Sequence, residues 1–256
     1  MNYEEARNYI AHIQGNLGSD YSLKEVTRLA EYMDRPDKKL QIVHIAGTNG
    51  KGSVLAYVST VLKEAGYKVG RYISPTIFSY RERIQVNESY ISREDLIRLT
   101  EKVKAAGDQL LAEGRQHPTM FEMETAIAFL YFAEQNCDLV VLEVGMGGRL
   151  DATNVIRNTK VAVLASISMD HMGFLGNTLG EIAEHKAGII KPGCTVVSAS
   201  QQPEAAVSVR KKAEQEGCEL ICVEPEKIKI EKRGLEGQIF SYKEHAQVEI
   251  ALAGEY

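Results

Sequence analysis

Six short β-rich runs, separated by segments with helical spacing, constrain the fold of this chain more than any other feature. Most of them are continuous apolar runs, which are typical of strands buried on both faces of a parallel sheet. Because strands and helices alternate along most of the chain, the sequence predicts an α/β fold, a doubly wound three-layer sandwich with a mostly parallel sheet. The predicted strands are LQIVHIA (40–46), KVGRYIS (68–74), DLVVLEVG (138–145), KVAVLASIS (160–168), CTVVSAS (194–200) and CELICVE (218–224).

Capping signals mark the starts of several predicted helices. The helix after the first strand has apolar spacing from Val54 to Leu62 and is expected to end at Gly66, a residue typical of helix C-caps. Elsewhere a Ser or Thr is followed three residues later by an acidic residue, the pattern of a capping box. The pairs are Ser22–Glu25, Thr119–Glu122, Thr178–Glu181 and, as a weaker relative, Ser92–Asp95.

Two segments depart from the strand–helix alternation. RIQVNESYIS (83–92) predicts a hairpin that turns near Asn87. The tail, residues 226–253, alternates polar and apolar residues, as in QIFSY and VEIALA. We expect it to form a small antiparallel addition at the edge of the main sheet.

Length and composition exclude several classes of protein. The chain has 256 residues, of which 44% are hydrophobic and 25% charged, values typical of one large globular domain or two small ones. Its net charge of −5 argues against nucleic acid as a main partner. No apolar run approaches the ~20 residues that span a bilayer, and the charged N-terminus has no apolar signal core. We therefore expect a cytoplasmic protein that has no membrane partner.

The cysteines predict no metal or redox motif. There are four of them and none forms a CxxC pair, while the spacing from Cys218 to Cys222 is a poor match to zinc sites. With Cys137 and Cys194 they are interpreted as reduced structural thiols.

The segment HIAGTNGKGS (44–53), between a predicted strand and a predicted helix, is the strongest candidate site. Small residues let backbone N–H groups surround phosphate oxygens, while a helix N-terminus and a lysine add positive charge. The segment departs from the usual phosphate-loop pattern, since Ile45 occupies the first glycine position and Gly52 separates Lys51 from Ser53. A glycine-rich turn without a ligand is the alternative. The predicted nucleotide-binding residues are Gly47, Thr48, Asn49, Gly50, Lys51, Gly52 and Ser53.

The string AGTNGKGS resembles the phosphate loop of the Mur ligase superfamily, and its GKGS ending resembles that of the folylpolyglutamate synthase/dihydrofolate synthase family. Further matches follow in the family's order, from about residue 5 to the end of the chain, and LEVGMGGRLDATN (142–154) is the most specific. Two residues depart from the family pattern: Thr76 stands where His often follows Ser-Pro, and His185 stands where Glu usually precedes the Lys. The other matching segments are 73–87, 119–132 and 168–193.

The resemblance implies an ATP-dependent ligase that joins L-glutamate to folates or to dihydropteroate. Amide formation requires an activated carboxylate, which ATP can provide as an acyl phosphate, with Mg²⁺ to offset the charge. By resemblance, residues 1–256 are the N-terminal, ATP-binding domain with a Mur-ligase-like fold, and the family's C-terminal glutamate-binding domain is absent from the chain. We expect the full-length protein to be a monomer and the 256-residue chain to be inactive as a fragment.

Metal ligands are expected at the carboxyl ends of the strands, where open α/β sheets bind their ligands. Glu143 ends one predicted strand, and His171 follows the next. The resemblance implies that Ser53, Glu143 and His171 hold Mg²⁺, and that a carbamylated Lys186 holds a second Mg²⁺. Taken alone, His171 would be a cap or core residue and Lys186 a solvated surface residue. The implied catalytic residues are Lys51, His171 and Lys186.

The substrate residues are expected on three segments. By resemblance, residues 74–83 form part of the pterin-side pocket, a phenylalanine offers its aromatic face to a pteridine ring, and an aspartate bonds to the ring nitrogens. Each could equally be a loop or core residue. The candidates are Ser74, Pro75, Tyr80, Arg83, Phe121 and Asp151.

Two alternative functions share part of this pattern. One is a nucleotide-binding module without ligase activity, against which the acidic glycine string 142–154 argues. The other is a Mur-type cell-wall ligase that joins an amino acid to a nucleotide-sugar peptide. The GKGS ending and the FEMET helix at 121–125 favour a ligase of folates over a cell-wall ligase.

Overall fold

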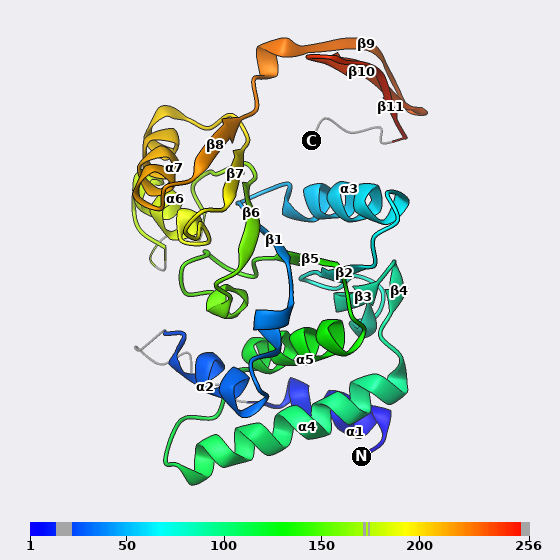
Figure 1. The fold of residues 1–256 in the computed structure, drawn as a ribbon, viewed down its shortest axis with the longest axis vertical. Coiled ribbons are helices and arrows are strands. Elements are labelled where there is room, and N and C mark those ends of the chain that lie inside the picture. The colour runs from blue at the N-terminus through cyan, green and yellow to red at the C-terminus, as the bar shows by residue number, and fades with distance from the viewer. Residues whose placement is uncertain (14–21, 171–172, 174, 252–256) are drawn as a thin grey trace.

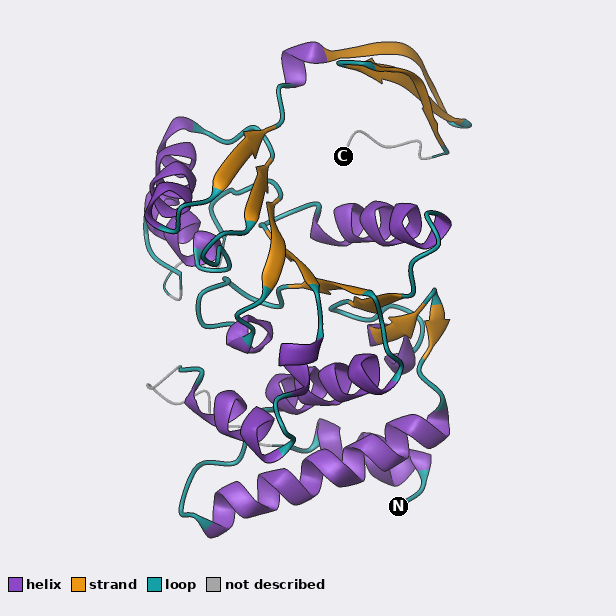
Figure 2. Ribbon diagram, viewed as in Figure 1, coloured by secondary structure: helices purple, strands orange, loops and turns teal. Residues whose placement is uncertain are grey.

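The computed structural model, which describes residues 1–13, 22–170, 173 and 175–251, is built around an eight-stranded sheet (Figures 1 and 2). The strand order is β4-β3-β2-β5-β1-β6-β7-β8; β3 pairs antiparallel with both β2 and β4, and all other neighbours pair parallel. The six predicted runs supply the parallel strands, so the α/β prediction is confirmed. The strands are β1 (Ile42–Ala46), β2 (Val69–Tyr72), β3 (Ile84–Val86), β4 (Ser89–Tyr90), β5 (Leu139–Glu143), β6 (Thr159–Leu164), β7 (Thr195–Ser198) and β8 (Glu219–Cys222).

Helices cover both faces of this sheet. One face packs against α3, and the other packs against α5, with α4 and α1 beyond it (Figure 1). On the central strand β1, Ile42 joins the core on the α5 side, while Val43 and Ile45 pack with Leu55 of α3. The helices are α1 (Tyr3–Ala11), α2 (Lys24–Tyr32), α3 (Lys51–Glu64), α4 (Arg93–Ala112), α5 (Met120–Glu134), α6 (Leu179–Ala187) and α7 (Pro203–Gln215). Short 3-10 helices are η1 (Pro36–Lys39), η2 (Tyr80–Arg83), η3 (Ala152–Val155) and η4 (Pro225–Lys227).

A third core cluster lies at the β6–β7 end of the sheet. There Ala162 and Val196 of the strands pack against Ile182 of α6 and Val209 of α7. This cluster fixes α6, which carries Lys186, against the sheet. Within the described residues, no helix combines the length and the apolar character that crossing a bilayer requires.

Three of the four predicted capping pairs are present. Thr119 and Thr178 form complete capping boxes, and the Ser92 side chain accepts a hydrogen bond from the amide of Asp95. The prediction at Ser22 was wrong: α2 begins at Lys24 with Leu23 at the N-cap and no side-chain cap. The helix starts one residue too late for the Ser22 hydroxyl to reach the amide that a capping box requires.

The two irregular segments have different outcomes. The hairpin is confirmed, because Asn87 and Glu88 link β3 to β4 with positive φ angles of 47° and 67°, as a tight two-residue turn needs. The tail forms the expected antiparallel strands, β9 (Ile228–Gly234), β10 (Gly237–Tyr242) and β11 (His245–Ile250).

The predicted position of the tail at the edge of the main sheet was wrong. The three strands form a sheet of their own, and β8 is the edge of the main sheet (Figure 2). The chain leaves β8 through η4, and β9 is exposed along its whole length. Its alternating apolar residues therefore do not reach the main core.

The capping box of α5 gives a prediction about stability. Thr119→Ala removes the side-chain oxygen that accepts a hydrogen bond from the Glu122 amide at 3.3 Å. We expect a loss of about 1 kcal/mol in the free energy of unfolding, measured by urea titration. Thr119→Ser keeps the oxygen and is the control, and equal stability of both variants would contradict the assignment.

Candidate functional site

The central strand β1 places the glycine-rich loop at the point where the sheet changes direction. After β1 the chain builds β2 and β5 on one side of it and β6, β7 and β8 on the other. In open α/β sheets, ligands bind outside the carboxyl ends of the strands at such a point. Residues 47–50 occupy that position, directly between β1 and α3.

The glycine-rich loop is held in a fixed shape. The Thr48 amide donates to the Ser166 carbonyl at 2.7 Å, and Asn49 bridges the same residue. A Cβ on Gly47 would lie 2.8 Å from the Cβ of Ala165, so only glycine fits there. Gly50 is the N-cap of α3 and supplies no side chain, which leaves the first-turn amides of α3 open to an anionic ligand.

Two lysines meet at one carbonyl of this loop. Lys51 Nζ donates to Gly47 O at 3.1 Å and to Thr48 O at 3.3 Å, and Lys186 Nζ donates to the same Gly47 O at 3.1 Å. Lys186 is only 2% exposed, which contradicts the alternative of a solvated surface lysine. Burial, and next the charge of Lys51, lower the pKa of Lys186 to about 8, although Asp170 acts in the opposite direction.

Glu143 lies beside the start of α3, at the carboxyl end of β5. It is buried, and its Oε2 accepts a hydrogen bond from the Ser74 amide at 3.1 Å. A Cβ on Gly52 would lie 4.0 Å from Glu143 Oε1, so this carboxylate faces the first turn of α3, which also carries Ser53. Burial raises the pKa of Glu143, whereas the Ser74 amide, Lys51 and Arg83 lower it. The predicted ligand His171 lies outside the described residues.

The glycine string after β5 packs against the end of α6. A Cβ on Gly148 would lie 2.7 Å from the His185 carbonyl, and the Arg149 amide donates to that carbonyl at 2.8 Å. Asn154 Nδ2 donates to Arg149 O at 2.9 Å and to Gly188 O at 3.1 Å. These contacts hold the α6 turn that carries Lys186 in place.

Asp151 is fully enclosed by its own loop. Its carboxylate accepts hydrogen bonds from the Met146 amide at 2.9 Å, the Thr153 amide at 3.0 Å and the Thr153 hydroxyl. The Thr153 hydroxyl also lies 2.8 Å from His44 Nε2 on β1. Burial lowers the pKa of His44 to about 3, so this histidine is neutral. Sequence reasoning missed the network, since residues 44 and 153 are far apart along the chain.

The predicted substrate residues lie in separate small groups. Ser74, followed by Pro75, joins Glu143 as described above. Arg83 Nη1 lies 3.3 Å from the buried carboxylate of Glu124, and burial raises the pKa of the neighbouring Tyr80. Phe121 packs near Tyr72, with ring centroids 5.9 Å apart and ring planes tilted by 44°, and fills the space where Gly145 has no side chain. The structure therefore links Phe121 to the glycine string, and Arg83 to an acid that the sequence did not indicate.

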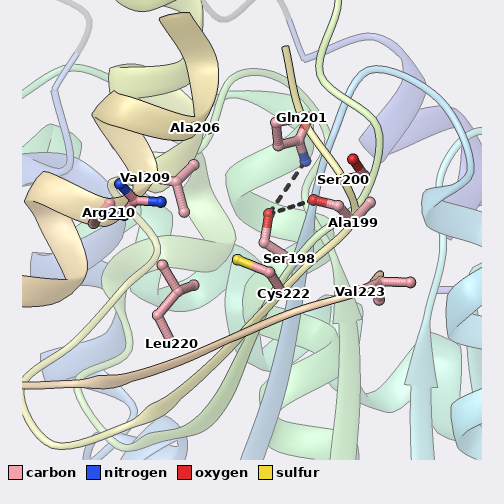
Figure 3. A pocket seen from close by; sticks show the side chains of 10 residues that line it. All are labelled: Ser198, Ala199, Ser200, Gln201, Ala206, Val209, Arg210, Leu220, Cys222 and Val223. Carbon is pink, nitrogen blue, oxygen red and sulfur yellow. Dashed lines mark hydrogen bonds between the residues drawn. The ribbon is translucent and has the colours of Figure 1, made fainter. Parts of the chain in front are cut away.

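A pocket of about 160 Å³ lies between α7 and the carboxyl ends of β7 and β8 (Figure 3). None of the predicted site residues lines it. Gln201 connects it to the segment that supports the loop, because its side chain bonds to Ala165 O at 2.8 Å and to the Ile167 amide at 3.0 Å.

The close packing of the glycine string predicts an intolerance to side chains. Gly148→Ala places a methyl group against backbone atoms of His185 and Lys186, which cannot move aside as a side chain can. We expect a loss of about 1–3 kcal/mol in the free energy of unfolding, measured by urea titration. Gly234→Ala is the control, since nothing lies within 4 Å of its added Cβ. If Gly148→Ala left the free energy of unfolding unchanged, the string would not be tightly packed on α6.

Comparisons with known proteins show the family of this chain. Residues 45–256 match the family model described as the Mur ligase middle domain. The chain is 45% identical to the dihydrofolate synthase/folylpolyglutamate synthase of Bacillus subtilis, covering 83% of this chain and 49% of that protein. It is 35% identical to the folylpolyglutamate synthase of Lacticaseibacillus casei, covering 100% of this chain and 61% of that protein.

Solved structures give the same result. The apo form of the L. casei synthase matches with a TM-score of 0.91 and 34% identity over 98% of this chain and 62% of that chain. A complex of such a synthase with AMPPCP and folate matches with the same score, identity and coverage. The chain spans about half to three-fifths of the length of these relatives. The chain belongs to the Mur ligase superfamily and, within it, to the folylpolyglutamate synthase/dihydrofolate synthase family.

Proposed function

We propose that this chain is the ATP-binding part of a ligase that adds L-glutamate to folates, to dihydropteroate, or to both. The observation that carries the proposal is the meeting of Lys51 and Lys186 at the Gly47 carbonyl, beside the open N-terminus of α3. Two ammonium groups at one carbonyl repel each other, and an anionic ligand between them would offset that repulsion. A relative of this family has been solved with AMPPCP and folate, which supports ATP as that ligand.

The reaction that we propose proceeds through an acyl phosphate. The γ-phosphoryl group of ATP passes to the substrate carboxylate, ADP leaves, and the amine of glutamate attacks the acyl carbon and releases phosphate. The loop amides and Lys51 hold the phosphates in line and stabilise the negative charge that develops on them. The rigid support of the loop by Ser166 keeps these donors in place before the substrate binds.

The residues around the loop fit Mg²⁺. Among the described residues, the Ser74 amide is the hydrogen-bond donor to Glu143, on Oε2, which leaves Oε1 directed toward the first turn of α3. A carboxylate oxygen and the Ser53 hydroxyl are ligands that Mg²⁺ prefers in proteins. When bound, Mg²⁺ would offset charge on the phosphates. His171 completes the ligand set that we propose.

Lys186 fits a carbamate better than an ammonium group. It is buried beside a second lysine, so a cation is poorly accommodated, and its lowered pKa increases the fraction of neutral amine that reacts with CO₂. The reaction forms an N–C bond and releases one proton, which converts the amine into an anionic carbamate. Its oxygen atoms would then be available to a second Mg²⁺, and its charge would pair with that of Lys51.

A second domain is part of this proposal. Amide formation needs glutamate held against a short-lived acyl phosphate with water excluded. We propose that a C-terminal domain supplies those contacts, that the full-length enzyme acts as a monomer, and that the 256-residue chain binds Mg·ATP but ligates nothing. We also propose Ser74, Pro75, Tyr80, Arg83, Phe121 and Asp151 as substrate residues. The carboxylate of Asp151 is buried and accepts hydrogen bonds from its own loop, so we propose that it contributes by holding that loop in place.

The proposed reaction is tested by glutamate-dependent release of ADP from the full-length enzyme. Folates or dihydropteroate should support turnover, and UDP-muramoyl peptides should not. Lys51→Ala and Ser53→Ala should each lower the rate by about 10²–10³-fold, because each removes one preorganised contact to the phosphates or the metal. Lys63→Ala, on the last turn of α3, is the matched control. If Lys51→Ala kept half of the wild-type rate at saturating ATP, the loop assignment would be wrong.

Carbamylation has a readout that does not depend on activity. Protein equilibrated with ¹³C-bicarbonate should show a carbamate signal by ¹³C NMR that is lost in Lys186→Ala. Lys191→Ala is a matched control, because burial also lowers the pKa of Lys191 to about 8 although it lies at the other end of the strands. A signal that persists in Lys186→Ala, or that disappears in Lys191→Ala, would count against the proposed site.

A further inference from the structure

Two thiols that are distant in sequence lie side by side at the amino ends of β7 and β8. Cys194 precedes β7 and Cys218 precedes β8, and the strands are parallel neighbours whose first pair is Thr195 with Glu219. The two Sγ atoms are 3.7 Å apart. A disulfide has an S–S length of about 2.04 Å, so bonding needs an approach of roughly 1.7 Å between these atoms.

The two turns that carry the thiols are bonded to each other. The Gly193 amide donates to the Glu216 carbonyl at 3.3 Å, and Cys218 Sγ donates to the Lys191 carbonyl at 3.2 Å. Cys194 is buried in the core cluster shared with α6 and α7, whereas Cys218 is partly exposed. One thiol is therefore accessible to a small reagent, and the other is held directly behind it.

We propose that Cys194 and Cys218 form a reversible oxidation site, at which a low-molecular-weight disulfide converts the two thiols into an intramolecular disulfide. The site differs from the other two cysteines. Cys137 is buried in a separate core cluster, and Cys222 is exposed at the opposite end of β8.

The chemistry balances in two exchange steps. The Cys218 thiolate attacks one sulfur of the reagent R–S–S–R, and one R–S⁻ leaves and takes up the proton lost by Cys218. The Cys194 thiolate then attacks the Cys218 sulfur of the mixed disulfide, and the second R–S⁻ leaves as R–SH. Two protein thiols are oxidised, and the reagent is reduced to two thiols. Burial raises the pKa of Cys194 to about 11, so the second step accelerates as the pH rises toward that value.

The cross-link encloses β7 and α7 and lies far from the phosphate loop. The loop follows the carboxyl end of β1, whereas both thiols precede the amino ends of strands that run parallel to it. Closing the loop from Cys194 to Cys218 restricts the unfolded chain, which raises stability when the folded geometry already suits the bond. Oxidation should therefore raise the melting temperature and leave the binding of nucleotide unchanged.

The test uses the Cys222→Ser variant, which removes the exposed thiol that could link two chains. The protein is incubated with glutathione disulfide, and its remaining thiols are counted with Ellman's reagent after unfolding. We expect the count to fall from three to one, a peptide pair joined through residues 194 and 218 in a non-reducing digest, and a higher melting temperature that dithiothreitol reverses. In Cys194→Ser/Cys222→Ser, glutathione should remain attached to Cys218.

Several outcomes would overturn the proposal. A stable mixed disulfide on Cys218 in the Cys222→Ser protein would show that Cys194 cannot reach it. If the thiol count stayed at three after prolonged incubation at pH 9, neither sulfur would be accessible to the reagent. A lowered melting temperature after cross-linking would show that the bond strains the fold. Because the thiol count and the digest are made on Cys222→Ser alone, poor folding of the double variant leaves the test intact.

Discussion

The Gly47 carbonyl oxygen is the point on which the candidate site depends. Lys51, from the start of α3, and Lys186, from the end of α6, both donate to it at 3.1 Å. One neutral carbonyl cannot offset two ammonium groups in a partly buried position, and burial together with the charge of Lys51 lowers the pKa of Lys186 to about 8. Among the described residues, the two ammonium groups therefore still repel each other at this carbonyl, although Asp170 acts in the opposite direction on Lys186. Anionic phosphates, and a carbamate in place of one ammonium group, would both offset that repulsion.

The rest of the fold brings these two lysines together from distant parts of the chain. Gly47 follows the carboxyl end of the central strand β1. Ala165 and Ser166, which follow β6, contact the loop from one side and hold it in place. The glycine string after β5 then packs on the last turn of α6 so closely that Gly148 has no room for a side chain. Small residues at these contacts allow backbone to touch backbone, which positions Lys186 with little freedom.

The sequence predicted the parallel strands well, because buried strands depend on local patterns, and it predicted the glycine-rich turn between a strand and a helix for the same reason. Apolar runs indicate buried strands, and a glycine-rich turn before a helix indicates a candidate anion site. The errors came from context: Ser22 has the residues of a capping box but not the helix start, and the alternating tail pairs with itself rather than with β8. Pairs such as Arg83 with Glu124, or Cys194 with Cys218, join separate elements, so no spacing along the chain reveals them.

The glycine string after β5 also shows that a family-specific sequence can be required by packing and not only by catalysis or binding. Gly145 admits the Phe121 ring, Gly148 admits the α6 backbone, and Asn154 bonds to carbonyls on both sides of the contact. The carboxylate of Asp151 accepts hydrogen bonds from its own loop. Thr153, one of these donors, also forms a hydrogen bond with His44 on β1, the strand that leads into the glycine-rich loop. A substitution at any of these positions would displace Lys186 or the loop without removing a group that touches a substrate. Within the string LEVGMGGRLDATN, Glu143 alone is a metal-ligand candidate, and the residues after it set the distance between that carboxylate and the α6 lysine.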